Sequence, residues 1–381
     1  MEELEQFEKI NQPISKKARG ILFVVILVIM IIGYVIYRIF ATFEAYEVSS
    51  TLDKEDAEQT SYMDFSDNLL SYSRDGAFYR DYSGNLIWNE TYEMANPQIE
   101  ICEDKLLIYD KTGTKALIQS VTGNIGSIST TLPIVEADVS SNGNVAVLMQ
   151  EGNTGYLNLY NAEGNILASG EVHTENTGYP ISVALSSDGE NMMVSLINLN
   201  DGDVKSTIVF YNFGSEGDKK DDNIVGNFSY SNLVIPEVDY VENDNAIAFG
   251  DSEVIVYAGG KEPKVKNEHF FSKEIKTVFH NNKYYGVVVS AEDGTNTLGV
   301  YNLRGKRRFE KVLEGSYTRA SFTKTNEVLL TDGQQVSLYT LLGVLKFNYK
   351  FTGGIYQMIP WESYRTYIIL EKGKMERIRL K

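Results

Sequence analysis

Apolar and polar residues alternate in short runs along most of this 381-residue chain. Residues 156–160, 298–301 and 336–339 are examples, and they are rich in β-branched and aromatic side chains. Alternation with a period of two predicts strands that bury one face. Turns that contain glycine separate the runs, and glycine suits tight hairpin turns because it tolerates positive φ. The pattern therefore predicts an all-β protein made of many short strands.

The glycine turns recur with a period. Eight of them lie 37 to 48 residues apart, at Gly76, Gly113, Gly155, Gly202, Gly250, Gly294, Gly333 and Gly373. A second series runs in step with the first, at Gly84, Gly123, Gly164, Gly214, Gly260, Gly305 and Gly343. Repeats of this length that are filled with short strands are typical of β-propellers, whose blades have four strands. Each blade then consists of strands a and b, a first turn, strand c, a second turn and strand d.

The two turn series differ in number, and this bears on how the ring closes. The chain ends at Lys381, just after the expected strand c of the last blade (375–380), so strand d must come from elsewhere. The segment 43–48 is the candidate, because an unpaired strand edge would invite aggregation. We expect an eight-bladed propeller, with seven blades as the alternative if the first or last unit is incomplete. Residues 212–223 lengthen the fourth blade and have the composition of a solvated loop.

An apolar run from Gly20 to Phe40 precedes the repeats. About 20 such residues in a helix span a bilayer core, whereas a cleaved signal peptide has a shorter apolar segment and a small-residue cleavage site. The run therefore predicts an uncleaved transmembrane helix. Lys16, Lys17 and Arg19 precede it, which favours a cytoplasmic amino terminus. The expected order is a cytoplasmic tail (1–19), a transmembrane helix (20–40), an extracytoplasmic linker with a possible ring-closing strand (41–60) and the propeller (61–381).

The formal net charge is −17, and almost all of it lies beyond residue 40. A surface of this charge disfavours nucleic acid, or an anionic lipid surface, as a partner. Cys102 is the single cysteine, so no intrachain disulfide can form, and we expect a buried, inert thiol on an inner strand.

Motifs for catalysis or metal binding are not apparent in the sequence. His173, His269 and His280 have no zinc-ligand spacing, and residues 198–203 lack the spacing and terminal glutamate of a calcium loop. A nucleophile elbow, a P-loop and a dinucleotide fingerprint are also missing. We therefore predict no catalytic, cofactor-binding or metal residues and no cofactor, and ligand-binding residues stay unknown. Residues remote in sequence are still able to form a site at the central channel.

Tyrosine is abundant, with 25 residues. Six tyrosines recur late in strands, and we expect them to pack between or at the edges of blades: Tyr109, Tyr160, Tyr211, Tyr257, Tyr301 and Tyr339. Five others lie outside the repeat and are candidates for a binding surface: Tyr62, Tyr72, Tyr179, Tyr364 and Tyr367.

The segment 79–88 resembles the repeats of quinoprotein-like or WD40-like propellers. In such repeats a glycine turn, here Gly84, is followed four residues later by a tryptophan, here Trp88, that docks on the next blade. The aromatic residue persists as Phe309 after Gly305 and as Phe347 after Gly343. The overall layout is similar to an uncharacterised family of single-pass membrane proteins from Gram-positive bacteria with such an ectodomain. The resemblance implies a fold and a location, and no activity.

These features favour a non-enzymatic interaction or scaffold module, held at the cell envelope by its membrane helix and binding another envelope protein. Two alternatives remain. One is a sensor of an envelope ligand, and the other is a propeller enzyme that acts on envelope carbohydrate or peptide through acidic residues converging on the channel.

Overall fold

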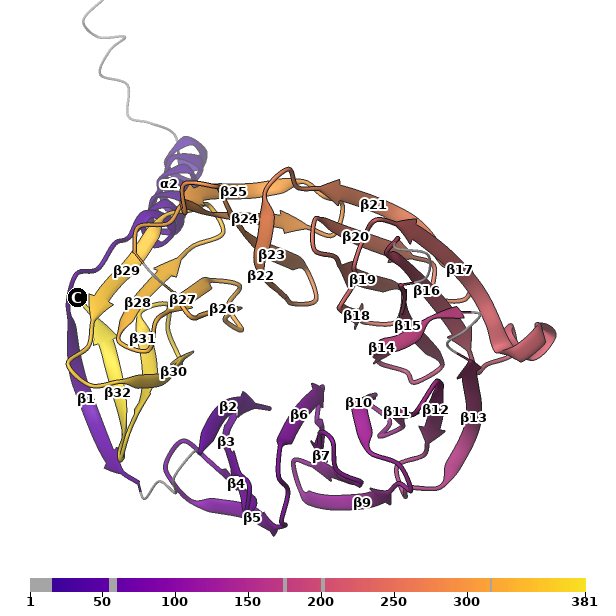
Figure 1. The fold of residues 1–381 in the computed structure, drawn as a ribbon. Helices are drawn as coiled ribbons and strands as arrows, with labels where there is room; N and C mark the ends of the chain where they lie inside the picture. Colours follow the sequence, from indigo (N-terminus) through magenta and orange to yellow (C-terminus); the bar gives the residue numbers. More distant parts are fainter. Residues whose placement is uncertain (1–15, 55–59, 174–176, 200–202, 316) are drawn as a thin grey trace, which may run out of the picture.

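The computed structural model describes residues 16–54, 60–173, 177–199, 203–315 and 317–381. They form a ring of eight antiparallel four-stranded sheets around a central channel, with one long helix at the rim (Figure 1). The eight-bladed propeller expected from the turn series is confirmed, and the seven-bladed alternative is wrong.

Each blade begins at an innermost strand beside the channel and ends at an outermost strand. From the inside outwards, blade one contains β2 (Ser61–Phe65), β3 (Asn68–Ser73), β4 (Gly76–Arg80) and β5 (Leu86–Thr91), and blade two contains β6 (Pro97–Cys102), β7 (Lys105–Asp110), β8 (Lys115–Ser120) and β9 (Gly123–Ser129). Blade three contains β10 (Ile134–Val139), β11 (Val145–Glu151), β12 (Thr154–Tyr160) and β13 (Ile166–His173), and blade four contains β14 (Tyr179–Leu185), β15 (Asn191–Asn198), β16 (Lys205–Asn212) and β17 (Ile224–Ser231).

The second half of the ring repeats this plan. In the same order, blade five contains β18 (Glu237–Val241), β19 (Asn245–Phe249), β20 (Glu253–Ala258) and β21 (Lys264–Phe270), and blade six contains β22 (Glu274–His280), β23 (Tyr284–Ser290), β24 (Asn296–Asn302) and β25 (Arg307–Val312). Blade seven contains β26 (Arg319–Phe322), β27 (Val328–Thr331), β28 (Gln335–Tyr339) and β29 (Leu345–Lys350), and blade eight contains β30 (Ile355–Pro360), β31 (Thr366–Glu371), β32 (Lys374–Leu380) and β1 (Tyr46–Asp53). The long blade-four loop holds two short 3-10 helices, η2 (Gly217–Lys219) and η3 (Asp221–Asn223), and no strand.

The eighth blade takes its outermost strand from the beginning of the chain. β1 pairs antiparallel with β32, from Tyr46 opposite Leu380 to Asp53 opposite Lys374. The sequence placed the ring-closing strand at 43–48, which overlaps β1 but starts three residues early. Those first residues pair differently, since Phe43 forms a parallel bridge with Phe347 in blade seven.

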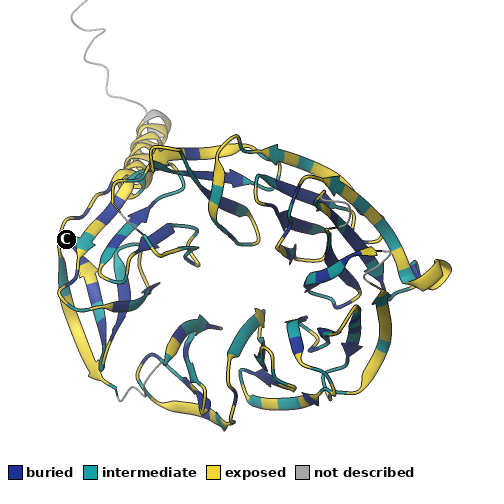
Figure 2. Cartoon of the chain, viewed as in Figure 1, coloured by how far each residue is buried: buried dark blue, intermediate teal, exposed yellow. Residues whose placement is uncertain are grey.

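Eight clusters of buried apolar side chains fill the wedges between neighbouring blades. Figure 2 shows the result, with buried residues on the middle strands and exposed residues along the outermost ones. Five of the six repeat tyrosines are buried in these wedges and Tyr211 is half-buried, as expected of packing residues. The ring therefore holds together by repeated apolar packing and by the β1–β32 pairing.

Some glycines of the turn series do not have positive φ, so the tolerance of glycine for positive φ does not explain every position of the series. Gly164 has φ +85°, but Gly113, Gly155 and Gly250 do not have positive φ. At Gly155 a β-carbon would lie 2.4 Å from the ring of Pro180, so glycine there allows blades three and four to approach closely.

Helix α2 (Lys16–Phe40) stands at the rim beside β25 of blade six and β29 of blade seven (Figure 1). Its segment Arg19–Phe40 has a mean hydropathy of 2.9 and exposed side chains, and is long and apolar enough to cross a membrane. The junction with the ring is short, because the backbone N–H of Phe43 donates to the Lys346 carbonyl at 2.7 Å and the Phe43 side chain is buried. Within the segment expected as a linker with a possible ring-closing strand, Ala41 and Phe43 are buried and residues 46–53 form β1.

Candidate functional site

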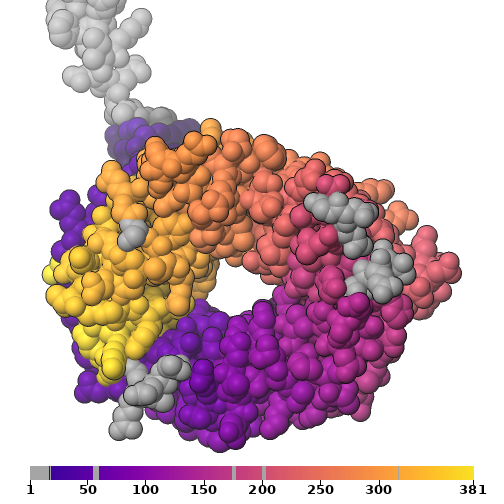
Figure 3. All heavy atoms as spheres, viewed as in Figure 1, coloured from indigo at the N-terminus to yellow at the C-terminus, as the bar shows by residue number. Residues whose placement is uncertain are grey.

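The central channel passes through the ring, and Figure 3 shows it open. Its wall is formed by the innermost strand of each blade, on which every second side chain faces the same way. In blades two, three and five these strands carry five acidic residues, which we call the channel carboxylates: Glu100 on β6, Glu136 and Asp138 on β10, and Glu237 and Asp239 on β18.

Hydrogen bonds hold part of this wall in place. The two carboxylate oxygens of Asp138 accept from the backbone N–H groups of Val139 and Leu185, each at 2.7 Å. Glu136 accepts from the hydroxyl of Ser182 at 3.2 Å, and that hydroxyl accepts from the N–H of Val238 at 3.2 Å. Blades three, four and five are thereby joined through their innermost strands.

The channel carboxylates lie close to like charges, and all are half-buried except the exposed Glu237. Burial, followed by the charge of Asp239, raises the pKa of Asp138 to about 8. Burial also raises the pKa of Glu136 to about 7. The pKa of Glu100 lies well above its usual range because of burial and then the surrounding carboxylates, led by Asp138. Protons are therefore held in this wall near neutral pH.

His280, at the end of β22, is the basic partner of the wall. Its Nε2 lies 2.8 Å from a carboxylate oxygen of Asp239, and its Nδ1 is buried with no hydrogen-bond partner among the described residues. Burial disfavours the charged ring, but the hydrogen bond and charge of Asp239 outweigh it and raise the pKa of His280. His173 and His269 lie elsewhere, on β13 and β21.

A cavity of about 200 Å³ opens where the innermost strands of blades two to six end. Cys102, Asp138, Asp239, His280 and Asn282 are among its lining residues. Cys102 is half-buried rather than buried, but burial raises the pKa of its thiol to about 11, so it stays protonated at neutral pH. The described residues contain no cluster of His, Cys, Asp and Glu arranged to hold a metal ion. The lining suits a cationic group, which carboxylates would bind by charge and hydrogen bonds.

The tyrosines outside the repeat lie in two other places. Tyr62 and Tyr72 line a cavity of about 560 Å³ at blades one, seven and eight. Tyr364 and Tyr367 line a larger cavity beside α2. Tyr179 begins β14 and lines neither of the two.

The sequence did not single out the channel carboxylates, although it carried a signal. Glu136 with Asp138 and Glu237 with Asp239 each recur at positions i and i+2 of an innermost strand, so both side chains of a pair share a face. Their convergence across blades depended on ring geometry that one blade does not reveal.

The family described as "Family of unknown function (DUF5711)" matches residues 39–380. This chain belongs to the DUF5711 family. The match spans the ring-closing strand and all eight blades, so the propeller is the matched part of this DUF5711 protein. No curated protein matches the chain.

Solved structures resemble the DUF5711 propeller in fold alone. BamB from Moraxella catarrhalis has a TM-score of 0.52 and 14% sequence identity, and the match covers 88% of this chain and 100% of BamB. Sqt1 from Saccharomyces cerevisiae has a TM-score of 0.51 and 12% identity, covering 88% of this chain and 98% of Sqt1. The computationally designed protein Ika8 has a TM-score of 0.50 and 14% identity, covering 89% and 99%.

We expect this DUF5711 propeller to lose thermal stability as the pH rises from about 5 to 8. Carboxyl groups in an unfolded chain release their protons near pH 4, whereas Glu136 and Asp138, with pKa values of about 7 and about 8, keep theirs in the fold. The folded state then binds more protons than the unfolded state, so the free energy of unfolding falls with rising pH. Melting temperatures measured at pH 5, 6, 7 and 8 check this.

A variant and its control assign the effect to the channel. Glu100→Gln replaces one confined carboxyl group, which repels its neighbours once deprotonated, with a neutral amide, and is expected to raise the melting temperature at pH 8 and flatten its pH dependence. Glu171→Gln, on an exposed position of β13, also removes one negative charge and is expected to change neither. Equal behaviour of the two variants would assign the pH dependence to overall charge instead.

Proposed function

We propose that this protein is a membrane-anchored β-propeller that acts outside the cytoplasm as an interaction or scaffold module at the cell envelope. The observation that carries the proposal is the direct junction between the apolar helix α2 and the ring. Phe43 and Ala41, which follow α2, are buried in the cluster between blades seven and eight. A helix of this kind in a bilayer would hold the propeller close to the membrane surface, with its orientation restrained.

The channel carboxylates supply a site for a partner within this proposal. Of the ionisable groups described above, only His280 is basic, and Asp239 already pairs with it. A lysine or arginine side chain of an envelope protein is the complementary group, because its positive charge would favour release of the protons held by Glu100, Glu136 and Asp138 and pair with the resulting carboxylates. The acidic character of the channel wall also disfavours nucleic acid, a polyanion, as a partner.

A second candidate rests on the raised pKa values of Glu136 and Asp138. Carboxyl groups that titrate near neutral pH inside a cleft are suited to general acid–base catalysis. A propeller enzyme acting on envelope carbohydrate or peptide would use them so. In that case Glu136→Gln abolishes turnover of the envelope substrate, whereas in a binding module it only weakens attachment of the partner.

Protease treatment and crosslinking of intact cells that express the full chain test the proposed function. Added protease is expected to remove the propeller and leave a small protected fragment that includes α2, and the native mass should include the amino-terminal segment. A mature chain that begins near Ala41, or a propeller protected from protease, would contradict the anchored, outward-facing arrangement.

The same cells report the partner site. A photo-reactive amino acid at Asn282, which lines the channel cavity, is expected to crosslink one envelope protein. The same photo-reactive amino acid at Asn227, an exposed position of the outermost strand β17, serves as the control. Glu136→Gln should reduce the Asn282 crosslink several-fold, and Glu171→Gln should leave it unchanged. Equal crosslinking from both positions would argue against a channel-mouth site.

A further inference from the structure

A cavity of about 890 Å³ lies between the end of α2 and blades six to eight, and we call it the anchor pocket. Helix α2 contributes Tyr34, Val35, Arg38 and Ile39, which recur on one side of the helix. The ring contributes turns at the same end of blades seven and eight, including Lys324, Leu342 and Trp361. The pocket therefore sits where the apolar helix meets the polar ring.

Four cationic residues line the anchor pocket against two carboxylates, Glu327 and Glu362: Arg38, Arg308, Lys324 and Lys346. Lys346 is already compensated, because its ammonium group pairs with Glu327 and donates to the hydroxyl of Tyr367 at 2.7 Å. The same tyrosine donates to Glu327 at 2.7 Å, which completes a closed buried network. Burial lowers the pKa of Lys346, and this residue is best read as a structural part of the pocket.

The uncompensated charge belongs to Arg38 and Arg308. Within the described residues neither guanidinium forms an ion pair, and both side chains are exposed. Arg38 lies 4.5 Å above the ring centre of Tyr364, a contact that keeps the guanidinium edge available for hydrogen bonds. Lys324 pairs with Asp67 at 2.6 Å, but both groups are solvent-exposed and such pairs are weak.

Apolar and aromatic side chains complete the anchor pocket. Val35 and Ile39 of α2 and the exposed Leu342 of blade seven give it an apolar edge, and Trp361 and Tyr364 are residue types that favour the membrane–water interface. Arg304 and Lys306 precede Arg308 in the turn that leads into β25, whereas the neighbouring Arg307 already pairs with Glu310 at 2.9 Å. The anchor pocket thus has more cationic than carboxylate residues in its lining, although the chain as a whole is negatively charged.

We propose that the anchor pocket binds the headgroup of one anionic phospholipid from the leaflet at which α2 ends. The phosphodiester would meet the guanidinium groups of Arg38 and Arg308, which suit phosphate oxygens, while the acyl chains lie along Val35 and Ile39. This inference rests on the proposed membrane anchoring. It revises the expectation that anionic lipid is disfavoured. Charges within a Debye length of the lipid phosphate, here those of the anchor pocket, affect its binding more than the net charge of the whole chain.

Native mass spectrometry of the full chain in mild detergent tests the proposal. Titration with phosphatidylglycerol is expected to add one lipid per chain, with at least tenfold tighter binding than phosphatidylcholine. The double variant Arg38→Gln/Arg308→Gln is expected to lose at least tenfold in affinity for phosphatidylglycerol. Both side chains are exposed, so an unchanged melting temperature shows that the fold is intact.

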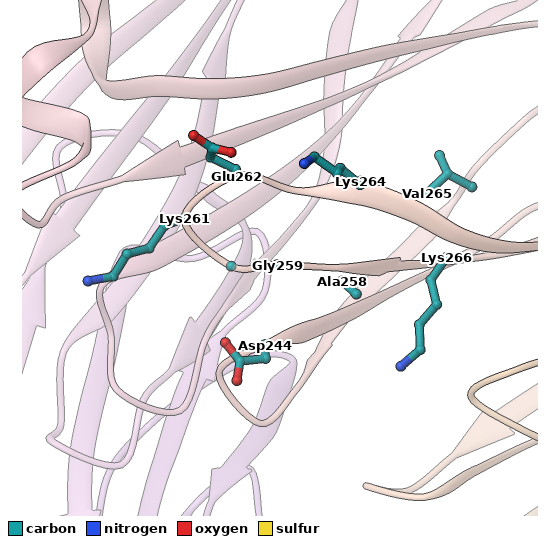
Figure 4. Close-up of a pocket in the computed structure, with 9 residues that line it drawn as sticks. Asp244, Ala258, Gly259, Lys261, Glu262, Lys264, Val265 and Lys266 are labelled. Carbon is teal, nitrogen blue, oxygen red and sulfur yellow. The ribbon is translucent and has the colours of Figure 1, made fainter.

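A matched control pair lies in blade five. Lys261 and Lys264 line a shallow cavity at the turn between β20 and β21, remote in sequence from α2, and Figure 4 shows their side chains around it with those of Asp244 and Glu262. Lys261→Gln/Lys264→Gln removes the same charge and is expected to leave phosphatidylglycerol binding unchanged. Equal loss in the two double variants would assign lipid binding to general surface charge and overturn the proposal.

Two further measurements distinguish a failure of the anchor-pocket proposal from a failure of the proposed membrane anchoring. Soluble glycerol phosphate that competes at the affinity of the lipid would overturn the lipid as the occupant. Flotation of cell membranes tests the anchor separately, because a chain absent from the membrane fraction contradicts the proposed function whatever the detergent titration shows. A membrane-bound chain that does not discriminate phosphatidylglycerol from phosphatidylcholine contradicts only the anchor pocket.

Discussion

A chain that begins at Thr60, and so lacks β1, is expected to aggregate, whereas a chain that begins at Ala41 is expected to stay monomeric. Removal of β1 exposes the backbone edge of β32 over the whole paired length from Lys374 to Leu380. It also removes Phe43, which is buried at the junction of blades seven and eight. An unpaired flat edge is a template for pairing with another chain, and lost apolar cover adds to the effect.

Size-exclusion chromatography and melting curves of the two chains check this expectation. A chain that begins at Ala41 and carries Phe43→Ala separates the two contributions. It keeps the β1–β32 pairing but loses a buried aromatic side chain, so it should melt earlier yet remain monomeric. Equal solubility and equal melting temperature of the chains that begin at Thr60 and Ala41 would show that β1 is not needed for closure.

Trp88→Ala is expected to lower the free energy of unfolding by about 3–5 kcal/mol, as truncation of a buried aromatic side chain does. Trp88 is 9% exposed in the wedge between blades one and two, where its indole stacks on Tyr79 with ring centres 5.2 Å apart. Its Nε1–H donates to the Ser120 carbonyl of the next blade at 3.0 Å. Given the unfolding entropy of a chain of this length, the melting temperature should fall by about 4–7 °C.

Two further variants define the role of Trp88. Trp88→Phe keeps the stacking and loses the hydrogen bond to blade two, so its melting temperature should lie between those of the wild type and Trp88→Ala. Phe78→Ala, at an exposed position of the adjacent strand β4, should have little effect. If Trp88→Ala melts like the wild type but fails to bind an envelope component, the residue belongs to a binding surface and the packing role is wrong.

The repeat of glycine turns and alternating strands was sufficient to predict the blades, because each blade is a local unit whose strands follow one another. The alternating runs 156–160, 298–301 and 336–339 differ from β12, β24 and β28 by no more than two residues at either end. The mismatch between eight and seven turns also pointed to closure from the amino-terminal segment. Trp88 was identifiable from its distance to Gly84, since the docking contact recurs in this class of repeat.

The two sites were not predictable in the same way. The channel carboxylates come from three blades, and Glu100 and Asp239 meet only because the ring closes. Net charge also gave no indication of the anchor pocket, because Arg38 and Arg308, which both line it, are 270 positions apart in the sequence. Both sites depend on long-range placement, for which a single sequence carries no local period.

Closure of the last blade by β1 also determines the order of events during synthesis. β1 is synthesised well before its partner β32, since Asp53 and Lys374 are 321 positions apart in the sequence. At typical elongation rates of about 5–20 residues per second, β1 waits for tens of seconds before β32 exists. During that time the growing propeller is an open arc. Its closing pair, β1 with β32, joins segments far apart in the sequence, and contacts of this kind form slowly. A factor that shields β1 until β32 has been synthesised would therefore act on the closure of the ring.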